Sequence, residues 1–150
     1  MLITYLILQL IGIVLVIFSS ICESVMDTLQ FHYERSVFLK KQNQKFWNPN
    51  ISWKNKYKKD LKTPKFIGST TIFVFTTDAW HLYKFFRNLL IFIGLPLIAF
   101  TAINVFNLIL AIFLARVLFG LFFTHYLYKY SNKPGLLQIF KQYIKNFVKK

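Results

Sequence analysis

Cysteine and acidic residues are scarce in this chain of 150 residues. The single cysteine, Cys22, excludes an internal disulfide and a paired-thiol metal motif. Only 5 aspartates and glutamates stand against 19 lysines and arginines, which gives a formal net charge of +14. A charge of this size suits nucleic acid, anionic lipid or cytosolic loops, so the position of the basic residues must decide between them.

Charge is absent from the first segment, residues 2–22, over about 20 residues, which is the length that spans about 30 Å of hydrocarbon. The whole chain is 55% hydrophobic and 19% aromatic, more than a small water-soluble core usually holds. No lysine or arginine precedes this segment and no small-residue cleavage pattern follows it, so we expect an uncleaved anchor. Residues 23–41 contain neither glycine nor proline, so the helix is expected to continue several turns beyond the membrane.

Two further spans are predicted over residues 80–103 and 107–128, joined by a tight connection near "NVFN". Thr77 is a plausible N-cap for the first of them, and Asp78 suits the positive end of its helix dipole. Pro96 should kink this helix. The segment 66–77 before it is either an interfacial segment or the first turns of a helix.

A lysine-rich loop, residues 38–66, separates the first two spans. Nine lysines, one acid and two prolines lie between residues 40 and 65. Trp47 and Trp53 flank an Asn-Pro turn, a composition suited to the headgroup level of a membrane. The tail, residues 136–150, places apolar side chains on one half of a helical wheel and lysines mainly on the other. It is expected to lie on an anionic membrane surface, although packing against the protein's own loop is an alternative.

The distribution of basic residues sets the expected orientation. None precedes Arg35 and none lies between the second and third spans. The positive-inside rule therefore places the N-terminus outside and the loop and C-terminus in the cytoplasm. The sequence predicts an all-α integral membrane protein of the cell (inner) membrane, with residues 1–150 as a single multi-pass membrane domain. Its architecture is three transmembrane helices plus a C-terminal amphipathic interfacial helix.

Ionisable residues of all three spans are expected at one depth, the inner headgroup boundary. At 1.5 Å per residue, Glu23 lies about 30 Å and His125 about 27 Å from the outer ends of their helices. Such a cluster could hold a divalent metal such as zinc, iron or manganese, which would activate water against a lipid headgroup ester or phosphate. The predicted metal ligands are Glu23, Asp27, His81 and His125. The predicted catalytic residues are Glu23, Asp27, Asp78 and His81, and the predicted lipid- or anion-binding residues are Lys84, Arg87 and Arg116.

The same residues also have a purely structural interpretation. Asp78 is then only a helix-start charge, and His81 is an interfacial side chain beside Trp80. Glu23 and Asp27 belong to the solvated continuation of a helix that leaves the bilayer. The spacing "DxxH" is a weak motif, and the sequence shows neither a Ser-His-Asp order nor a phosphate-cradling glycine loop.

Arg116 lies about 13 Å from the external end of the third span, where a charge is costly and normally faces a partner. Its candidate partners are Glu23, Asp27, Asn104 and Asn107. Arg116 is half a helical wheel from His125, so both cannot point straight into one pocket.

The stretches "FWNPNISWKNKYK" and "STTIFVFTTDAWHLYK", with "TTDAWH" at the centre of the second, cover about a fifth of the chain. Here the chain resembles uncharacterised small multi-pass membrane proteins of bacteria and their phages. The resemblance implies that the loop and the "TDAWH" segment belong together, with the loop capping a pocket. It implies no activity and names no catalytic residue.

Two functions therefore stay open. The first is a small metal-dependent enzyme that acts on lipid headgroups at the cytoplasmic membrane face. The second is a non-catalytic membrane protein that oligomerises, binds lipid or perturbs the bilayer, since the predicted topology is similar to that of phage holins. The expected partners are membrane lipids, especially anionic inner-leaflet headgroups, and further copies of the chain. A nucleic-acid partner is not expected, because topology already accounts for the lysines.

Overall fold

The computed structural model describes residues 2–101, 105–128, 141–142 and 144–146. This part of the chain is helical and contains no strand, only one isolated antiparallel bridge between Tyr57 and Pro64. The long helices are α1 (Leu2–His32), α4 (Ala79–Thr101) and α5 (Val105–Tyr128). The short helical turns are η1 (Tyr33–Arg35), η2 (Val37–Lys40), α2 (Gln44–Trp47), α3 (Pro49–Ser52), η3 (Trp53–Lys56) and η4 (Val74–Thr76).

Three helical segments are long and apolar enough to cross a membrane: Ile3–Arg35, Ala79–Ala99 and Leu108–His125. The prediction of three such helices is confirmed, and α1 does continue past residue 22, to His32. The segment 66–77 is not a continuous helix, because only η4 within it is helical. Helix α5 begins at Val105, so three of the four residues of "NVFN" belong to the helix, and residues 102–104 lie outside the described residues. The predicted tail helix at 136–150 falls largely outside the described residues.

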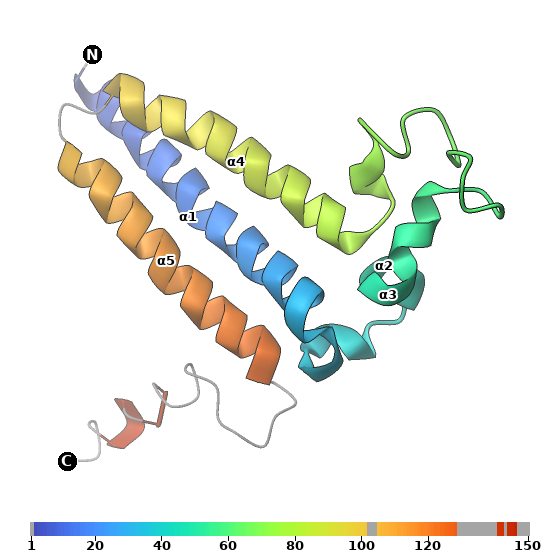
Figure 1. Cartoon of the computed structure of the whole chain (residues 1–150). Helices are drawn as coiled ribbons and strands as arrows, with labels where there is room; N and C mark the ends of the chain where they lie inside the picture. Colours follow the sequence, from blue (N-terminus) through green and yellow to red (C-terminus); the bar gives the residue numbers. More distant parts are fainter. Residues whose placement is uncertain (1, 102–104, 129–140, 143, 147–150) are drawn as a thin grey trace.

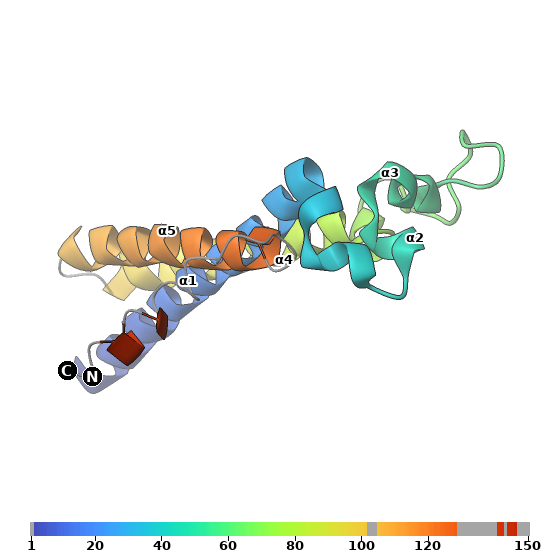
Figure 2. The ribbon, with the colours of Figure 1, turned by 90° about the horizontal axis from the view of Figure 1, so that it is seen from below.

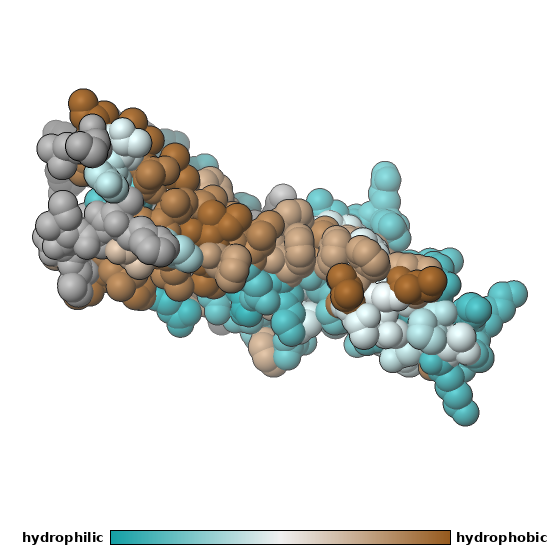
Figure 3. Space-filling view, turned by 90° about the horizontal axis from the view of Figure 1, so that it is seen from above, coloured by the Kyte–Doolittle hydropathy of each residue, from teal (hydrophilic) through white to brown (hydrophobic). Residues whose placement is uncertain are grey.

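Helix α1 lies between α4 and α5 (Figure 1). The short helices and the loop extend beyond the end of this bundle where α4 begins (Figure 2). Hydrophobic residues cover the bundle, whereas hydrophilic residues gather at the loop end (Figure 3). The bundle also exposes large apolar side chains to its surroundings, among them Ile3, Leu10, Phe92 and Phe113, as expected of a surface that contacts lipid.

The backbones of α1 and α4 approach each other closely at two glycines. A Cβ added to Gly12 would lie 2.8 Å from the carbonyl oxygen of Gly94, and one added to Gly94 would lie 2.9 Å from the carbonyl oxygen of Gly12. Small residues allow such backbone contact, and this contact is a main source of helix association in lipid. A small core of Val16, Ile98, Ala111 and Ala115 then joins all three helices.

Four buried hydroxyl groups along α1 bond to carbonyl oxygens of the same helix. Ser19, Ser20 and Ser24 each donate to the residue three positions earlier, at 2.6–2.7 Å. Thr28 donates to the carbonyl oxygen of Ser24 at 2.7 Å. Because the hydroxyls are satisfied within α1, this face can pack against its neighbours without water. The hydroxyl groups of Ser19 and Ser20 are therefore satisfied within α1 and allow the helix to pack closely.

We predict that Gly12→Ala destabilises the bundle by about 1–3 kcal/mol, because its methyl group would overlap the Gly94 backbone. The control is Gly120→Ala in α5, where an added Cβ meets nothing within 4 Å. Alanine is the better helix former, so this control should be neutral or slightly stabilising. Unfolding in mixed detergent micelles, followed by circular dichroism, measures both. Equal stability of the two variants would contradict the close α1–α4 contact.

Candidate functional site

Asp78 is the residue that caps the start of α4. Its Oδ1 accepts a hydrogen bond from the backbone N–H of His81 at 2.9 Å, and its carbonyl oxygen accepts from Leu82 N–H at 3.1 Å. This is the geometry of an N-cap aspartate. The prediction of Thr77 as the N-cap is therefore wrong by one residue. The Thr77 hydroxyl lies 2.7 Å from the carbonyl oxygen of Val74 and 3.1 Å from Asp78 Oδ2.

The second carboxylate oxygen of Asp78 holds the imidazole of His81. The distance from Oδ2 to His81 Nδ1 is 2.7 Å, and the side chains of Asp78 and His81 are 4% and 25% exposed. Burial alone would raise the pKa of Asp78. The hydrogen bonds from the His81 side chain and backbone, together with the His81 charge, outweigh that effect and hold the pKa below its usual value. The pair is thus an ionised, buried carboxylate that orients a partly accessible imidazole.

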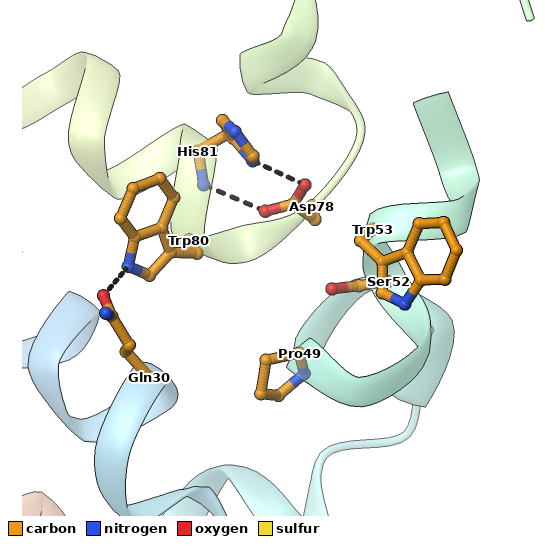
Figure 4. Close-up of a pocket in the computed structure, with 7 residues that line it drawn as sticks. All are labelled: Gln30, Pro49, Ser52, Trp53, Asp78, Trp80 and His81. Carbon is orange, nitrogen blue, oxygen red and sulfur yellow. Dashed lines mark hydrogen bonds and ion pairs between the residues drawn. The ribbon is translucent and has the colours of Figure 1, made fainter. Parts of the chain in front are cut away.

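A surface pocket of about 280 Å³ opens beside this pair (Figure 4). On one side, the Trp80 indole N–H donates to Gln30 Oε1 of α1 at 3.2 Å. The residues that line the pocket are Gln30, Pro49, Ser52, Trp53, Asp78, Trp80 and His81. In the described part of the chain no hydrogen bond joins Ser52 to His81, so the pocket shows no serine–histidine–aspartate relay.

The lysine-rich loop is fixed to the start of α4 by one amide. Asn55 Nδ2 donates to the carbonyl oxygens of Lys45, at 2.6 Å, and of Thr77, at 2.9 Å. The loop also contacts α4 through an aromatic ring. Trp47 stacks on Phe38, with ring centroids 5.1 Å apart, and contacts Tyr83 of α4. These aromatic rings pack against a small core of Val25, Leu29, Tyr33, Phe38 and Ala79. The loop thus forms one wall of the pocket, which is the contact between loop and "TDAWH" that was expected.

The predicted four-residue metal cluster does not form. Among the described residues, no group of three or more histidine, cysteine, aspartate or glutamate side chains lies close enough to hold a metal ion. The expectation was wrong because equal depth does not fix direction around a helix, and because the expected depth was itself inaccurate. Glu23 pairs with Arg116, which precedes His125 by nine residues, about 13 Å along α5. His81 turns to Asp78, and Glu23 turns to α5. His125 is exposed on α5, and Asp27 is only half-buried on α1.

Arg116 of α5 pairs with Glu23 of α1, which is one of its four predicted partners. The distance from Arg116 Nη1 to Glu23 Oε2 is 3.9 Å, and the Arg116 guanidinium also lies over the Phe119 ring, 5.2 Å from its centroid. The two charged side chains are 67% and 37% exposed in the isolated chain. A charge within a candidate span therefore has a counter-charge and an aromatic contact, the usual compensation in such a position.

The other two predicted anion-binding residues, Lys84 and Arg87, already have partners, and only Lys84 contacts a residue that lines the pocket. The Lys84 ammonium lies 4.9 Å from the centroid of the Trp80 ring. Arg87 donates to Asn88 Oδ1 from Nε at 3.2 Å and from Nη2 at 3.0 Å. Lys84 is exposed, so its ammonium stays accessible beside the pocket.

No protein-family model matches the chain, and no curated protein or solved structure matches it significantly. The chain's own geometry must therefore carry its functional assignment.

We predict that Asp78→Ala destabilises the protein by about 1–2 kcal/mol, the usual cost of removing an N-cap side chain. Asp78→Asn should cost less, because asparagine also caps a helix well. Chemical unfolding of the detergent-purified protein measures the difference, and an unchanged stability of Asp78→Ala would contradict the cap.

The pH dependence separates the charge of Asp78 from its capping role. Because the folded-state pKa lies below the usual value, the carboxylate stabilises the protein at pH values above about 4, its ordinary pKa. This contribution is lost as the pH falls through the lower folded-state pKa. The advantage of the wild type over Asp78→Asn should therefore shrink in acid. A constant advantage from pH 6 to pH 2 would contradict an ionised Asp78.

Proposed function

We propose that this chain is a three-span membrane protein that binds anionic lipid headgroups, without catalysis, through the lysine-rich loop at residues 38–66. The proposed orientation has the N-terminus outside and the loop and C-terminus in the cytoplasm. The absence of basic residues before Arg35 supports this orientation, because the basic residues of short cytoplasmic loops determine topology. The headgroup-binding face would be the loop end of the molecule, around the start of α4.

Lysine ammonium groups stacked on aromatic rings are the observation that carries the proposal. Four such pairs lie at the loop end, with ammonium-to-centroid distances of 4.9–5.7 Å. Aromatic rings with a polar edge and basic side chains both concentrate at the headgroup level of membranes. The four pairs are Lys41–Trp47, Lys54–Trp53, Lys56–Tyr57 and Lys84–Trp80.

The loop carries far more positive than negative charge, with nine lysines and one acid between residues 40 and 65. Asp60 is its single acid, and Asp60 Oδ1 accepts hydrogen bonds from the backbone N–H groups of Lys62 and Thr63 within a turn. The carboxylates of Asp78 and Glu23 pair with His81 and Arg116, which lie outside the loop. Each lysine near an anionic surface contributes about 1 kcal/mol of attraction, so the nine together favour anionic lipid strongly.

We predict that replacing Lys54, Lys56, Lys58 and Lys59 by glutamine weakens binding of a phosphatidylglycerol analogue at least about tenfold, since four attractive charges are removed. Titration of the detergent-purified protein with a fluorescent analogue measures the dissociation constant. The matched control is the four lysine-to-arginine substitutions, which keep the charge and should keep the affinity. Equal affinity of the glutamine variant and the wild type, or equal binding of phosphatidylcholine, would contradict the proposal.

A second candidate function is acid–base chemistry on a lipid headgroup at the Asp78–His81 pair. The observation in its favour is the 2.7 Å contact, which orients an imidazole on the wall of a pocket. A carboxylate that fixes one ring nitrogen leaves the other nitrogen to exchange a proton with a bound molecule. A metal-dependent form of this chemistry would need a cluster of metal ligands, and the described residues contain none.

The two candidates are separated by incubating the reconstituted protein with mixed phospholipids and analysing the lipids by mass spectrometry. The enzyme hypothesis predicts loss or change of a headgroup that disappears in His81→Ala. Unchanged lipids in the presence of a divalent metal would contradict catalysis and would leave headgroup binding as the function.

A further inference from the structure

The segment before η4 forms a compact turn that presents its apolar side chains outward. Residues 66–73, named here the apolar turn, include Ile67 at 95% exposure, Ile72 at 77%, Phe73 at 47% and Phe66 at 43%. Brown atoms stand out from the white and teal surface at the loop end of the molecule (Figure 3). An isolated apolar side chain on a surface is ordinary, but several in one short turn mark a contact surface.

Hydrogen bonds, rather than burial of these side chains, hold the turn. The carbonyl oxygen of Gly68 accepts from Thr71 N–H at 3.0 Å and from Phe73 N–H at 2.8 Å. The Ser69 hydroxyl donates to the carbonyl oxygen of Lys56 at 2.7 Å and accepts from Lys65 N–H at 3.1 Å. Gly68 has a φ of +81°, and a Cβ there would lie 2.8 Å from Phe73 Cδ2. The turn is therefore a defined platform whose isoleucines are not needed for its own fold.

A chain of aromatic contacts sets the level of the turn along α4. The Phe75 ring stacks on Phe85 with centroids 4.4 Å apart, and Phe73 lies 6.4 Å from Phe75. Phe85 is six residues beyond Ala79, about 9 Å along the helix from its start. Phe85 also lies within the candidate span Ala79–Ala99 and is 40% exposed. The apolar turn is thus continuous with the apolar outer surface of α4.

We propose that the apolar turn inserts into the boundary between headgroups and acyl chains of the same membrane that α4 crosses. Ile67 and Ile72 would contact acyl chains, while the neighbouring exposed Lys62 and Lys65 would face headgroups. This is the arrangement of apolar and basic side chains that interfacial segments use. The inference rests on the proposed membrane placement of α4 but not on the binding of anionic lipid.

The test measures membrane depth with single spin labels in a Cys22→Ser background. The labelled variants are Ile67→Cys in the turn and Lys59→Cys as an exposed loop control. Phe92→Cys, 78% exposed in α4, is the reference for the membrane interior. Each is reconstituted in phosphatidylcholine vesicles, with and without phosphatidylglycerol. Accessibility to oxygen, which enters lipid, is compared with accessibility to a water-soluble nickel chelate.

We expect an oxygen-to-nickel accessibility ratio several-fold higher at position 67 than at position 59, in both lipid compositions. If the ratio at position 67 equals that at position 59 while the label at position 92 lies in lipid, insertion of the apolar turn is overturned. The membrane placement of α4 would then still hold. Low accessibility of 67 to both reagents would also overturn it, because a second copy of the chain or another protein surface would then cover the turn. An aqueous label at 92 would overturn the membrane placement and the insertion together. The two tests are independent. The expected accessibility ratio at position 67 is the same whether or not the lysine-to-glutamine variant loses affinity for anionic lipid.

Discussion

The close contact of α1 and α4 at Gly12 and Gly94 is the constraint on which the rest of the structure depends. In lipid, two apolar helices gain little by avoiding solvent, so the closeness of their packing determines where they meet. With the glycines in contact, the antiparallel helices run in a register that brings Gln30 of α1 to Trp80 of α4. That contact fixes the level at which α4 begins.

The polar contacts around the start of α4 follow from that level. Asp78 starts α4, holds His81 and sits beside Thr77, whose carbonyl oxygen receives the Asn55 amide of the loop. The loop lysines are therefore kept at the end of the helix bundle, where a membrane would expose its headgroups. An ionised buried aspartate is acceptable there because three hydrogen bonds replace the water that it loses.

Much of the fold could be predicted from the sequence, because charge-free segments of spanning length are a strong local signal. The length of α1 beyond residue 22 also followed from the lack of glycine and proline. The predicted metal cluster does not form among the described residues, because depth along a helix says nothing about which neighbour a side chain faces. Glu23 pairs with Arg116 of α5, whereas His81 pairs with Asp78. The role of Asn55 was missed altogether, because an asparagine in a lysine-rich loop carries no sequence signal for a tertiary hydrogen bond.

The position of α1 against α4 is the central claim, and the contact between Gln30 and Trp80 reports it directly. Solid-state NMR of the protein in bilayers can detect magnetisation transfer between the Trp80 indole nitrogen and the Gln30 side chain. A cross-peak between them is expected, since Trp80 Nε1 and Gln30 Oε1 lie 3.2 Å apart. Its absence, in spectra that show both helices intact, would mean that α1 and α4 pack in another register.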